Sequence, residues 1–178
     1  MFEAIVPSTK DTRLGFHQIL AAYKDMYNLG DTQIQCVSLP GYLHIRSEKE
    51  FPGSKKADFV KSGEIKFDLD YCTVANYMSK EVEGRFIRFK DDEKIIRSIT
   101  KACTEGGLSD VAVEIHSFTR ETLNLGKSRK APLPVVKLSV TANVVDSSSF
   151  EKLVAKGIGK RRSYGLGMLQ IGRKYYAS

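Results

Sequence analysis

The sequence predicts an α+β fold made of two tandem ferredoxin-like domains. Short segments with alternating apolar residues occur in both halves, and each half places a helical pattern after its first strand. The predicted order is β-α-β-β-(α)-β followed by β-α-β-β-α-β, with the second helix of the N-terminal half the weakest element. A chain of 178 residues is long enough for two small domains. We expect these domains at residues 1–82 and 83–178, with 70–82 as a bridge.

The elements of the N-terminal half follow from local signals. A stripe of apolar residues spaced three and four apart indicates a helix, and Gly30 follows it as a stop signal. Pro40 and Gly41 separate two apolar strands. In order, we expect a strand at 2–6, a helix at 13–28, strands at 34–39 and 42–46, a polar loop or one short helix at 47–63, and a strand at 64–69.

The C-terminal half has clearer helix boundaries. Asp91 and Asp92 are typical N-terminal caps, and Gly106-Gly107 ends the helix that they begin. In order, we expect a strand at 84–89, a helix at 91–105, a strand at 111–117, a basic loop at 120–131, a strand at 135–144, a helix at 147–156 and a closing strand at 168–171.

A glycine-rich basic segment precedes that last strand. It reads Gly157-Ile-Gly-Lys-Arg-Arg-Ser-Tyr-Gly-Leu-Gly167, with four glycines around three consecutive cations. Glycine lets the backbone approach a ligand closely, and successive amides in such a loop suit phosphate oxygens. The spacing matches neither a P-loop nor a dinucleotide-binding turn. The segment predicts a nucleic-acid ligand; a tight surface turn with solvated charges is the alternative.

The overall composition agrees with a polyanionic partner. The formal net charge is +7, which favours nucleic acid and predicts salt-dependent binding. The three cysteines are far apart and have no metal-ligand spacing with the three histidines, so we expect reduced, buried thiols, no metal and no cofactor. The N-terminus lacks a signal-peptide pattern and no apolar run has membrane-spanning length. We therefore expect a cytoplasmic protein without a membrane partner.

Three segments resemble the RAMP superfamily of CRISPR proteins. They are residues 135–169 with the glycine-rich segment, the helix followed by Gly106-Gly107, and Gly15-Phe-His-Gln-Ile-Leu20 on the first helix. More narrowly, they resemble the endoribonucleases that cut CRISPR precursor RNA within each repeat. The C-terminal loop looks most like the type I-E branch, whereas His17-Gln18 followed by Val37-Ser38-Leu39-Pro40 is similar to the type I-F branch.

The resemblance implies catalytic roles for three residues. Metal-independent cleavage needs a base for the RNA 2′-hydroxyl, and histidine has a suitable unperturbed pKa of about 6.5. His17 is implied as that base, and a nearby Arg13 would favour its neutral form. Tyr164 would orient His17 or, alternatively, pack the loop onto the sheet. Ser117 would fix a ribose or, alternatively, is an ordinary turn residue. His116 is a rival base.

The resemblance and the charges together predict an RNA-binding surface. The glycines would hold the loop against the RNA backbone, and the cations would neutralise phosphates or grip the repeat stem. Each cation has the alternative role of a solvated charge. The predicted RNA-binding residues are Arg13, Lys127, Arg129, Lys130, Gly157, Gly159, Lys160, Arg161, Arg162 and Gly165.

The implied function is CRISPR RNA maturation. The protein would cleave repeat hairpins without a metal, leave 2′,3′-cyclic phosphate and 5′-hydroxyl ends, and stay on the guide RNA beside other subunits of a Cascade-type surveillance complex. Two alternatives remain open. One is a noncatalytic subunit that binds the end of the guide RNA, and the other is a generic RRM-like RNA-binding module.

Overall fold

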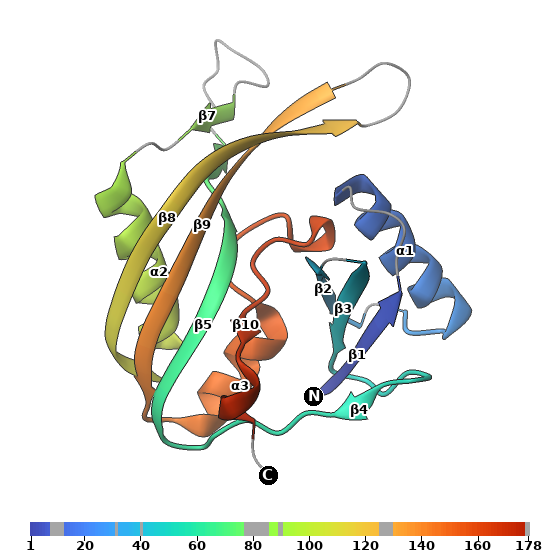
Figure 1. Ribbon diagram of the computed structural model, residues 1–178, viewed down its shortest axis with the longest axis horizontal. Coiled ribbons are helices and arrows are strands. Elements are labelled where there is room, and N and C mark those ends of the chain that lie inside the picture. Colours follow the sequence, from blue (N-terminus) through green and yellow to red (C-terminus); the bar gives the residue numbers. More distant parts are fainter. Residues whose placement is uncertain are drawn as a thin grey trace.

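Two four-stranded antiparallel sheets lie side by side in the computed structural model, with helix α3 and the C-terminal segment between them (Figure 1). The structure describes residues 1–7, 13–30, 32–39, 41–76, 86–88, 91–124 and 130–176. The strand order is β2-β3-β1-β4 in the first sheet and β10-β5-β9-β8 in the second. Both orders are those of a ferredoxin-like domain, so the predicted α+β tandem fold is confirmed.

The first sheet is covered by one helix, α1 (Arg13–Met26). Apolar side chains alternate along the strands, so that Cys36, Leu43 and Ile45 pack towards Leu20 of α1. Residues 48–54 form no helix, so the polar stretch is a loop and the N-terminal domain is reduced. The strands are β1 (Phe2–Pro7), β2 (Ile34–Leu39), β3 (Tyr42–Ser47) and β4 (Lys55–Lys56).

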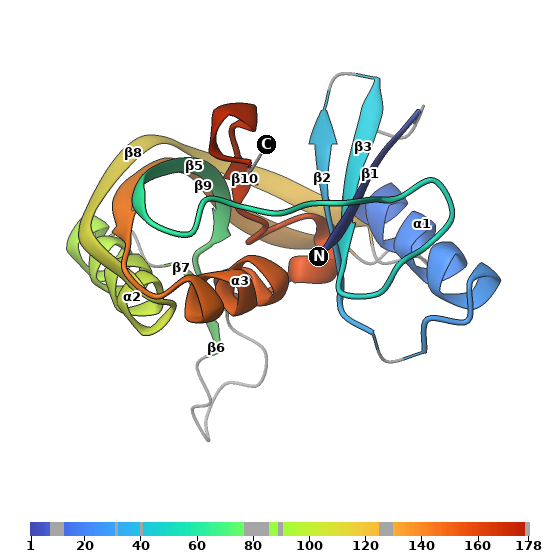
Figure 2. The same cartoon turned by 90° about the horizontal axis from the view of Figure 1, so that it is seen from below.

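Both helices of the C-terminal half, α2 (Asp92–Glu105) and α3 (Ser147–Lys156), lie on the same side of the second sheet (Figure 2). The Asp91 side chain accepts a hydrogen bond from the Lys94 amide, and Asp146 caps α3 in the same way. Ile99 and Phe150 are fully buried against the sheet. Its strands are β5 (Gly63–Cys72), β8 (Leu108–Asn124), β9 (Lys130–Val144) and β10 (Gln170–Ile171).

The strand predicted at 64–69 belongs to the second sheet, not to the first. It is β5, and it pairs with β9 from Gly63 opposite Val144 to Cys72 opposite Val135. The sheets therefore divide between β4 and β5, earlier than the expected division at 82/83. An alternating pattern shows that a strand has a buried face but not which strand it pairs with, so the sequence could not decide this.

The strand predicted at 84–89 does not begin the second sheet. Its described part is β7 (Phe86–Arg88), which pairs only with β6 (Val74–Asn76), and this pair lies outside both main sheets. The two-stranded pair explains why the sequence showed an alternating segment here. The edge position in the second sheet belongs to β10, and β5 takes the inner position beside it.

Both ends of the basic loop predicted at 120–131 are strand instead. Residues 120–124 continue β8 and 130–131 begin β9, while 125–129 lie outside the described residues. Pro132 and Pro134 suggested a loop because proline cannot donate a ladder hydrogen bond. Both prolines precede Val135, the first residue of β9 that pairs with β5. In this part β9 pairs only with β8 among the described strands, so it needs fewer backbone donors.

Candidate functional site

Helix α1 lies against the glycine-rich segment. The short 3-10 turn η1 (Arg162–Tyr164) within that segment contacts α1, and α1 also contacts β8. Figure 1 shows the orange-red turn beside α1. Elements from opposite ends of the chain, each carrying residues that the sequence predicts to be functional, are therefore neighbours.

The glycine-rich segment is a closed loop tied to the second sheet. The Ile158 amide donates to the Gly167 carbonyl at 2.8 Å, and the Gly167 amide donates to the Asp70 carbonyl of β5 at 2.8 Å. Gly167 has a φ of +76°, and a Cβ there would overlap the carbonyl oxygen of Ile158. Loop closure thus explains this glycine without any ligand.

The three glycines predicted to bind RNA also have partners within the protein. The Gly157 amide donates to Leu153 at 2.7 Å, and the Gly165 amide donates to Arg162 at 3.0 Å. A Cβ on Gly159 would lie 2.6 Å from the ring of Tyr71. These positions shape the loop, and an RNA contact by their backbone stays a prediction.

The three cations of the loop differ in availability. Lys160 and Arg161 are exposed, and Arg161 adopts left-handed backbone angles (φ 62°, ψ 32°) that are uncommon for a residue with a side chain. The guanidinium of Arg162 instead donates a hydrogen bond to the Lys156 carbonyl at the end of α3. Lys160 and Arg161 are therefore the exposed cations of the loop, and their contact with phosphates stays a prediction.

Tyr164 is half-buried at the end of η1. It packs against a cluster of Cys72, Leu133, Val135 and Leu166, which joins the loop to β5 and β9. This contact is the packing role that the sequence left open for Tyr164. A hydrogen bond from its hydroxyl group to a reacting group stays a prediction.

Several predicted residues have no described side chain. Arg13 and His17 lie on the first part of α1, and Lys130 is the first residue of β9, but their side chains lie outside what the structure describes. Lys127 and Arg129 are outside the described residues altogether. For the candidate base His17, the structure shows only the position of its helix, which lies next to η1 and β8.

Ser117 lies at an irregularity in β8. The pairing of β8 with β9 shifts register between Ile115 and Ser117, and Ser117 is opposite Lys137. Thr119, two residues further along β8, pairs with Val135, which lies beneath Tyr164. Bulges often re-aim side chains near functional sites. The catalytic role of Ser117 stays a prediction.

The rival base His116 is held in a side-chain network at the same bulge. Its Nε2 lies 2.6 Å from Oγ of Ser139, and that hydroxyl donates to Oδ1 of Asp68 at 2.6 Å. Because the serine hydrogen goes to the carboxylate, Nε2 of His116 must be the donor in its own contact. The other ring nitrogen, Nδ1, keeps its lone pair and lies 3.8 Å from Oε1 of Glu114, so His116 stays a rival base.

A second histidine belongs to a charged network between the sheets. Nε of Arg46 lies 2.5 Å from Glu3, Nε2 of His44 lies 3.3 Å from Glu3, and the hydroxyl of Tyr176 donates to Glu3 at 2.8 Å. Nη1 of Arg46 also donates to the Leu169 carbonyl at 3.0 Å, which links β3 to the segment before β10. The network therefore joins the two halves.

The charges in this network shift the acidity of two groups. Burial by itself would raise the pKa of Glu3, but the hydrogen bond from His44 and the charge of Arg46 outweigh it and lower that pKa to about 2. Burial, together with the nearby Glu3 carboxylate, raises the pKa of Tyr176 to about 12. No local pattern in the sequence indicated this network, because its members are spread over residues 3 to 176.

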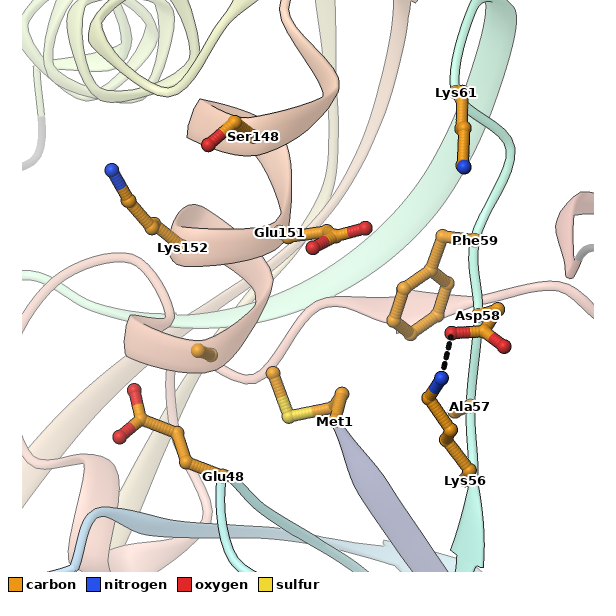
Figure 3. Close-up of a pocket in the computed structure, with 11 residues that line it drawn as sticks. Met1, Glu48, Lys56, Ala57, Asp58, Phe59, Lys61, Ser148, Glu151 and Lys152 are labelled. Carbon is orange, nitrogen blue, oxygen red and sulfur yellow. Dashed lines mark ion pairs between the residues drawn. The ribbon is translucent and has the colours of Figure 1, made fainter.

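Two surface hollows lie away from the glycine-rich segment. One of about 660 Å³ separates α3 from residues 56–61, and its walls carry both signs of charge. Glu151 points from α3 toward the side of the Lys56–Asp58 ion pair, whereas Lys152 points away from it (Figure 3). The other, of about 890 Å³, is lined by residues of both halves, including Glu3 and His44. Neither is lined by a residue predicted to bind RNA.

Within the described part of the chain, no group of three or more His, Cys, Asp or Glu side chains comes together in a way that could hold a metal ion. None of the described helices is long and apolar enough to cross a membrane.

The fold and the loop define a tandem ferredoxin-like protein with a basic, glycine-rich segment before its last strand. A family model described as CRISPR associated protein matches residues 55–173, which is more than half of the chain. The protein belongs to this family. No curated protein sequence is similar enough to count as a match.

Several solved structures share the fold over almost the whole chain. Cse3 of Thermus thermophilus, in a structure with an RNA representing a pre-cleavage complex, has a TM-score of 0.71 at 14% identity and covers 96% of this chain and 98% of its own. Cas6e from Escherichia coli K-12 has a TM-score of 0.63 at 13% identity, with 97% and 99% covered. A chain of a CRISPR RNA-guided surveillance complex has a TM-score of 0.66 at 16% identity, with 97% and 99% covered. At these identities the likeness shows the fold alone.

Proposed function

We propose that this protein is a metal-independent endoribonuclease that cleaves CRISPR repeat RNA. Its family membership and a fold shared with Cse3 and Cas6e support a role in CRISPR RNA processing. The observation that carries the proposal is the contact of α1 with η1, because it puts the helix of the candidate base next to the exposed loop cations.

The proposed reaction uses residues of both elements. His17 takes the proton from a ribose 2′-hydroxyl while that oxygen bonds to the adjacent phosphorus. The bond from phosphorus to the 5′-oxygen breaks, and this oxygen leaves as a hydroxyl after it receives a proton. The products carry a 2′,3′-cyclic phosphate and a 5′-hydroxyl. DNA lacks the attacking group, so the chemistry selects RNA.

The exposed cations of the loop stabilise the reacting phosphate. Lys160 and Arg161 provide positive charge where negative charge builds up on the phosphorus oxygens. Lys127, Arg129 and Lys130, which follow β8 in the sequence, bind the stem of the hairpin through its phosphates. Arg13 contributes charge one helical turn before His17.

After cleavage, the protein stays on the guide RNA within a surveillance complex. Solved structures with the same fold include one bound to RNA and one named as part of an RNA-guided surveillance complex. The sign of the net charge, +7, agrees with retention on RNA. A soluble, cytoplasmic location fits this role.

The proposal is tested by incubating the purified protein with several CRISPR repeat RNAs in EDTA. We expect one cut in a cognate repeat, with a 2′,3′-cyclic phosphate on the upstream product. The same repeat with a single 2′-deoxy nucleotide at the cut site should bind equally well and stay intact. Tight binding of every repeat without any cleavage would overturn the nuclease and favour the noncatalytic guide-RNA-binding subunit. Preference for unpaired RNA over the hairpin would instead favour an RRM-like module.

A further inference from the structure

The C-terminal end of α3 is capped by side chains from the other half of the protein. The last four carbonyls of a helix have no partner within the helix. Here Leu153 accepts from the Gly157 amide, and Lys156 accepts from Nε2 of Gln33 at 2.7 Å and from Arg162. Nε2 of Gln35 donates to the remaining two carbonyls, those of Val154 (3.2 Å) and Ala155. Side chains from β2 and the residue just before it therefore bind three of the four carbonyls.

In the contact between Gln35 and the end of α3, called the joint below, Gln35 is almost completely buried. Its side chain is 1% exposed, and it packs where a side chain on Gly157 would otherwise be. A Cβ on Gly157, which has a φ of +70°, would lie 2.5 Å from the Gly167 carbonyl oxygen and 2.9 Å from Oε1 of Gln35. The first glycine of the segment thus leaves room for a glutamine of the N-terminal half.

The joint connects the two elements of the proposed active site. Gln35 is on β2, which contacts α1, and α3 leads directly into the glycine-rich segment. Arg162 holds the end of α3, so η1 is fixed to the same point as the two glutamines. β2 also contacts η1 itself. A continuous series of contacts therefore runs from α1 through β2 and Gln35 to the end of α3, and from there to η1.

We infer that Gln35, assisted by Gln33, is a positioning residue that sets the distance between α1 and the loop cations. The inference rests on the proposed function for its effect on cleavage, but not for its effect on geometry. Gln35 does not touch RNA in this account. Loss of its amide leaves two buried carbonyls without donors, so the end of α3 and the loop behind it shift relative to α1.

The geometric effect is measured with spin labels. Labels at Lys24→Cys on α1 and Lys160→Cys in the loop report the distance between the two elements, and the three native cysteines are buried. Gln35→Met keeps the size of the side chain and removes its donor. We expect a narrow distance distribution in the parent protein and a broadened or shifted one in the Gln35→Met variant. An unchanged distribution would overturn the inference.

The matched control is Gln170→Met in β10. Gln170 is half-buried, and its side chain makes no hydrogen bond within the described part of the chain. We expect the parent distribution in this variant. Gly157→Ala disturbs the same joint from the opposite side and should mimic Gln35→Met. If Gln35→Met does not fold, Gln33→Met is used instead, because it removes the half-buried second donor. We expect it to shift the distance distribution in the same direction by a smaller amount, and an unchanged distribution would again overturn the inference.

The functional effect separates chemistry from binding. Displacing a reacting group by about 1 Å costs about 100-fold in rate, so Gln35→Met should lower the single-turnover cleavage rate about 10- to 100-fold. Its affinity for the 2′-deoxy repeat RNA should change by less than about 3-fold, because the exposed cations remain. Equal losses of rate and affinity would contradict positioning. If no repeat is cleaved by the parent protein, the proposed function fails while the distance measurement still decides the inference.

Discussion

The two halves share one strand order but differ in how each sheet is closed. The second sheet has two helices on one face and an apolar core of its own, in which Phe67, Ile99 and Phe150 are fully buried. The first sheet has one helix, and its other face carries Gln35 and Arg46, both almost completely buried by contact with the C-terminal half. We therefore expect the N-terminal half to depend on contacts with the C-terminal half for its stability, and the C-terminal half to be stable by itself.

This difference has a consequence for the proposed site. The candidate base lies on the dependent half and the loop cations lie on the independent half. Polar contacts of Gln35 and Arg46 with the C-terminal half help to set their relative position, together with the packing of Met1 against the C-terminal core. Hydrogen bonds weaken when their distance or angle changes, whereas apolar packing is much less directional. Polar contacts are therefore suited to fixing a geometry.

Arg46→Met is expected to have the largest effect on the stability of the N-terminal half relative to the C-terminal half. The change leaves Glu3 largely buried without its cation, and breaking a buried ion pair costs about 3–5 kcal/mol. We expect denaturant unfolding to split into two steps, with the N-terminal half unfolding first. Circular dichroism and proteolysis during the titration would show which half is lost.

An exposed ion pair gives the control for this variant. Lys56→Met breaks the contact of Lys56 with Asp58 (3.6 Å), in which both side chains are more than half exposed, so less than about 1 kcal/mol should be lost. The double variant Glu3→Gln with Arg46→Met should lose less than the sum of the single losses. A single-step transition with the stability of the parent protein would refute the dependence of the N-terminal half.

A smaller effect is expected from pH. The pKa of Glu3 is lowered from 4.5 to about 2 in the folded protein. A lowered carboxyl pKa contributes stability above about pH 4.5, and this contribution disappears as the pH falls through about 2. Its size is up to about 3 kcal/mol, since one pKa unit corresponds to about 1.4 kcal/mol.

The Glu3→Gln variant isolates this contribution, because all other carboxyl groups titrate in both proteins. The stability difference between the parent and Glu3→Gln should be greatest near neutral pH. It should shrink steadily between pH 4.5 and 2. A difference that stays constant across this range would show that Glu3 does not hold the two halves together by charge.

The sequence predicted the elements with strong local signals. Helix α2 follows from its Asp91 cap and the Gly106-Gly107 stop, and α3 from its Asp146 cap. The partner of the strand at 64–69 was wrong because strand pairing is a long-range property. The weak second helix of the N-terminal half is absent from residues 48–54.

The candidate site was only partly accessible from the sequence. The glycine-rich segment and the first helix were both singled out, and the structure puts them in contact. The sequence could not show that Arg162 binds the end of α3, since a run of cations does not reveal which one is used internally. It also could not show Gln35, because a single buried glutamine has no periodic pattern.

In the proposed reaction, a base on α1 acts on RNA held by the glycine-rich segment. The most direct test compares single-turnover cleavage of a cognate repeat by His17→Ala and by Gln18→Ala, its exposed neighbour on the same helix. We expect His17→Ala to lower the rate by about 100- to 10,000-fold with unchanged affinity for the 2′-deoxy repeat, while Gln18→Ala cleaves like the parent. Cleavage by His17→Ala at the parental rate would show that His17 is not the base.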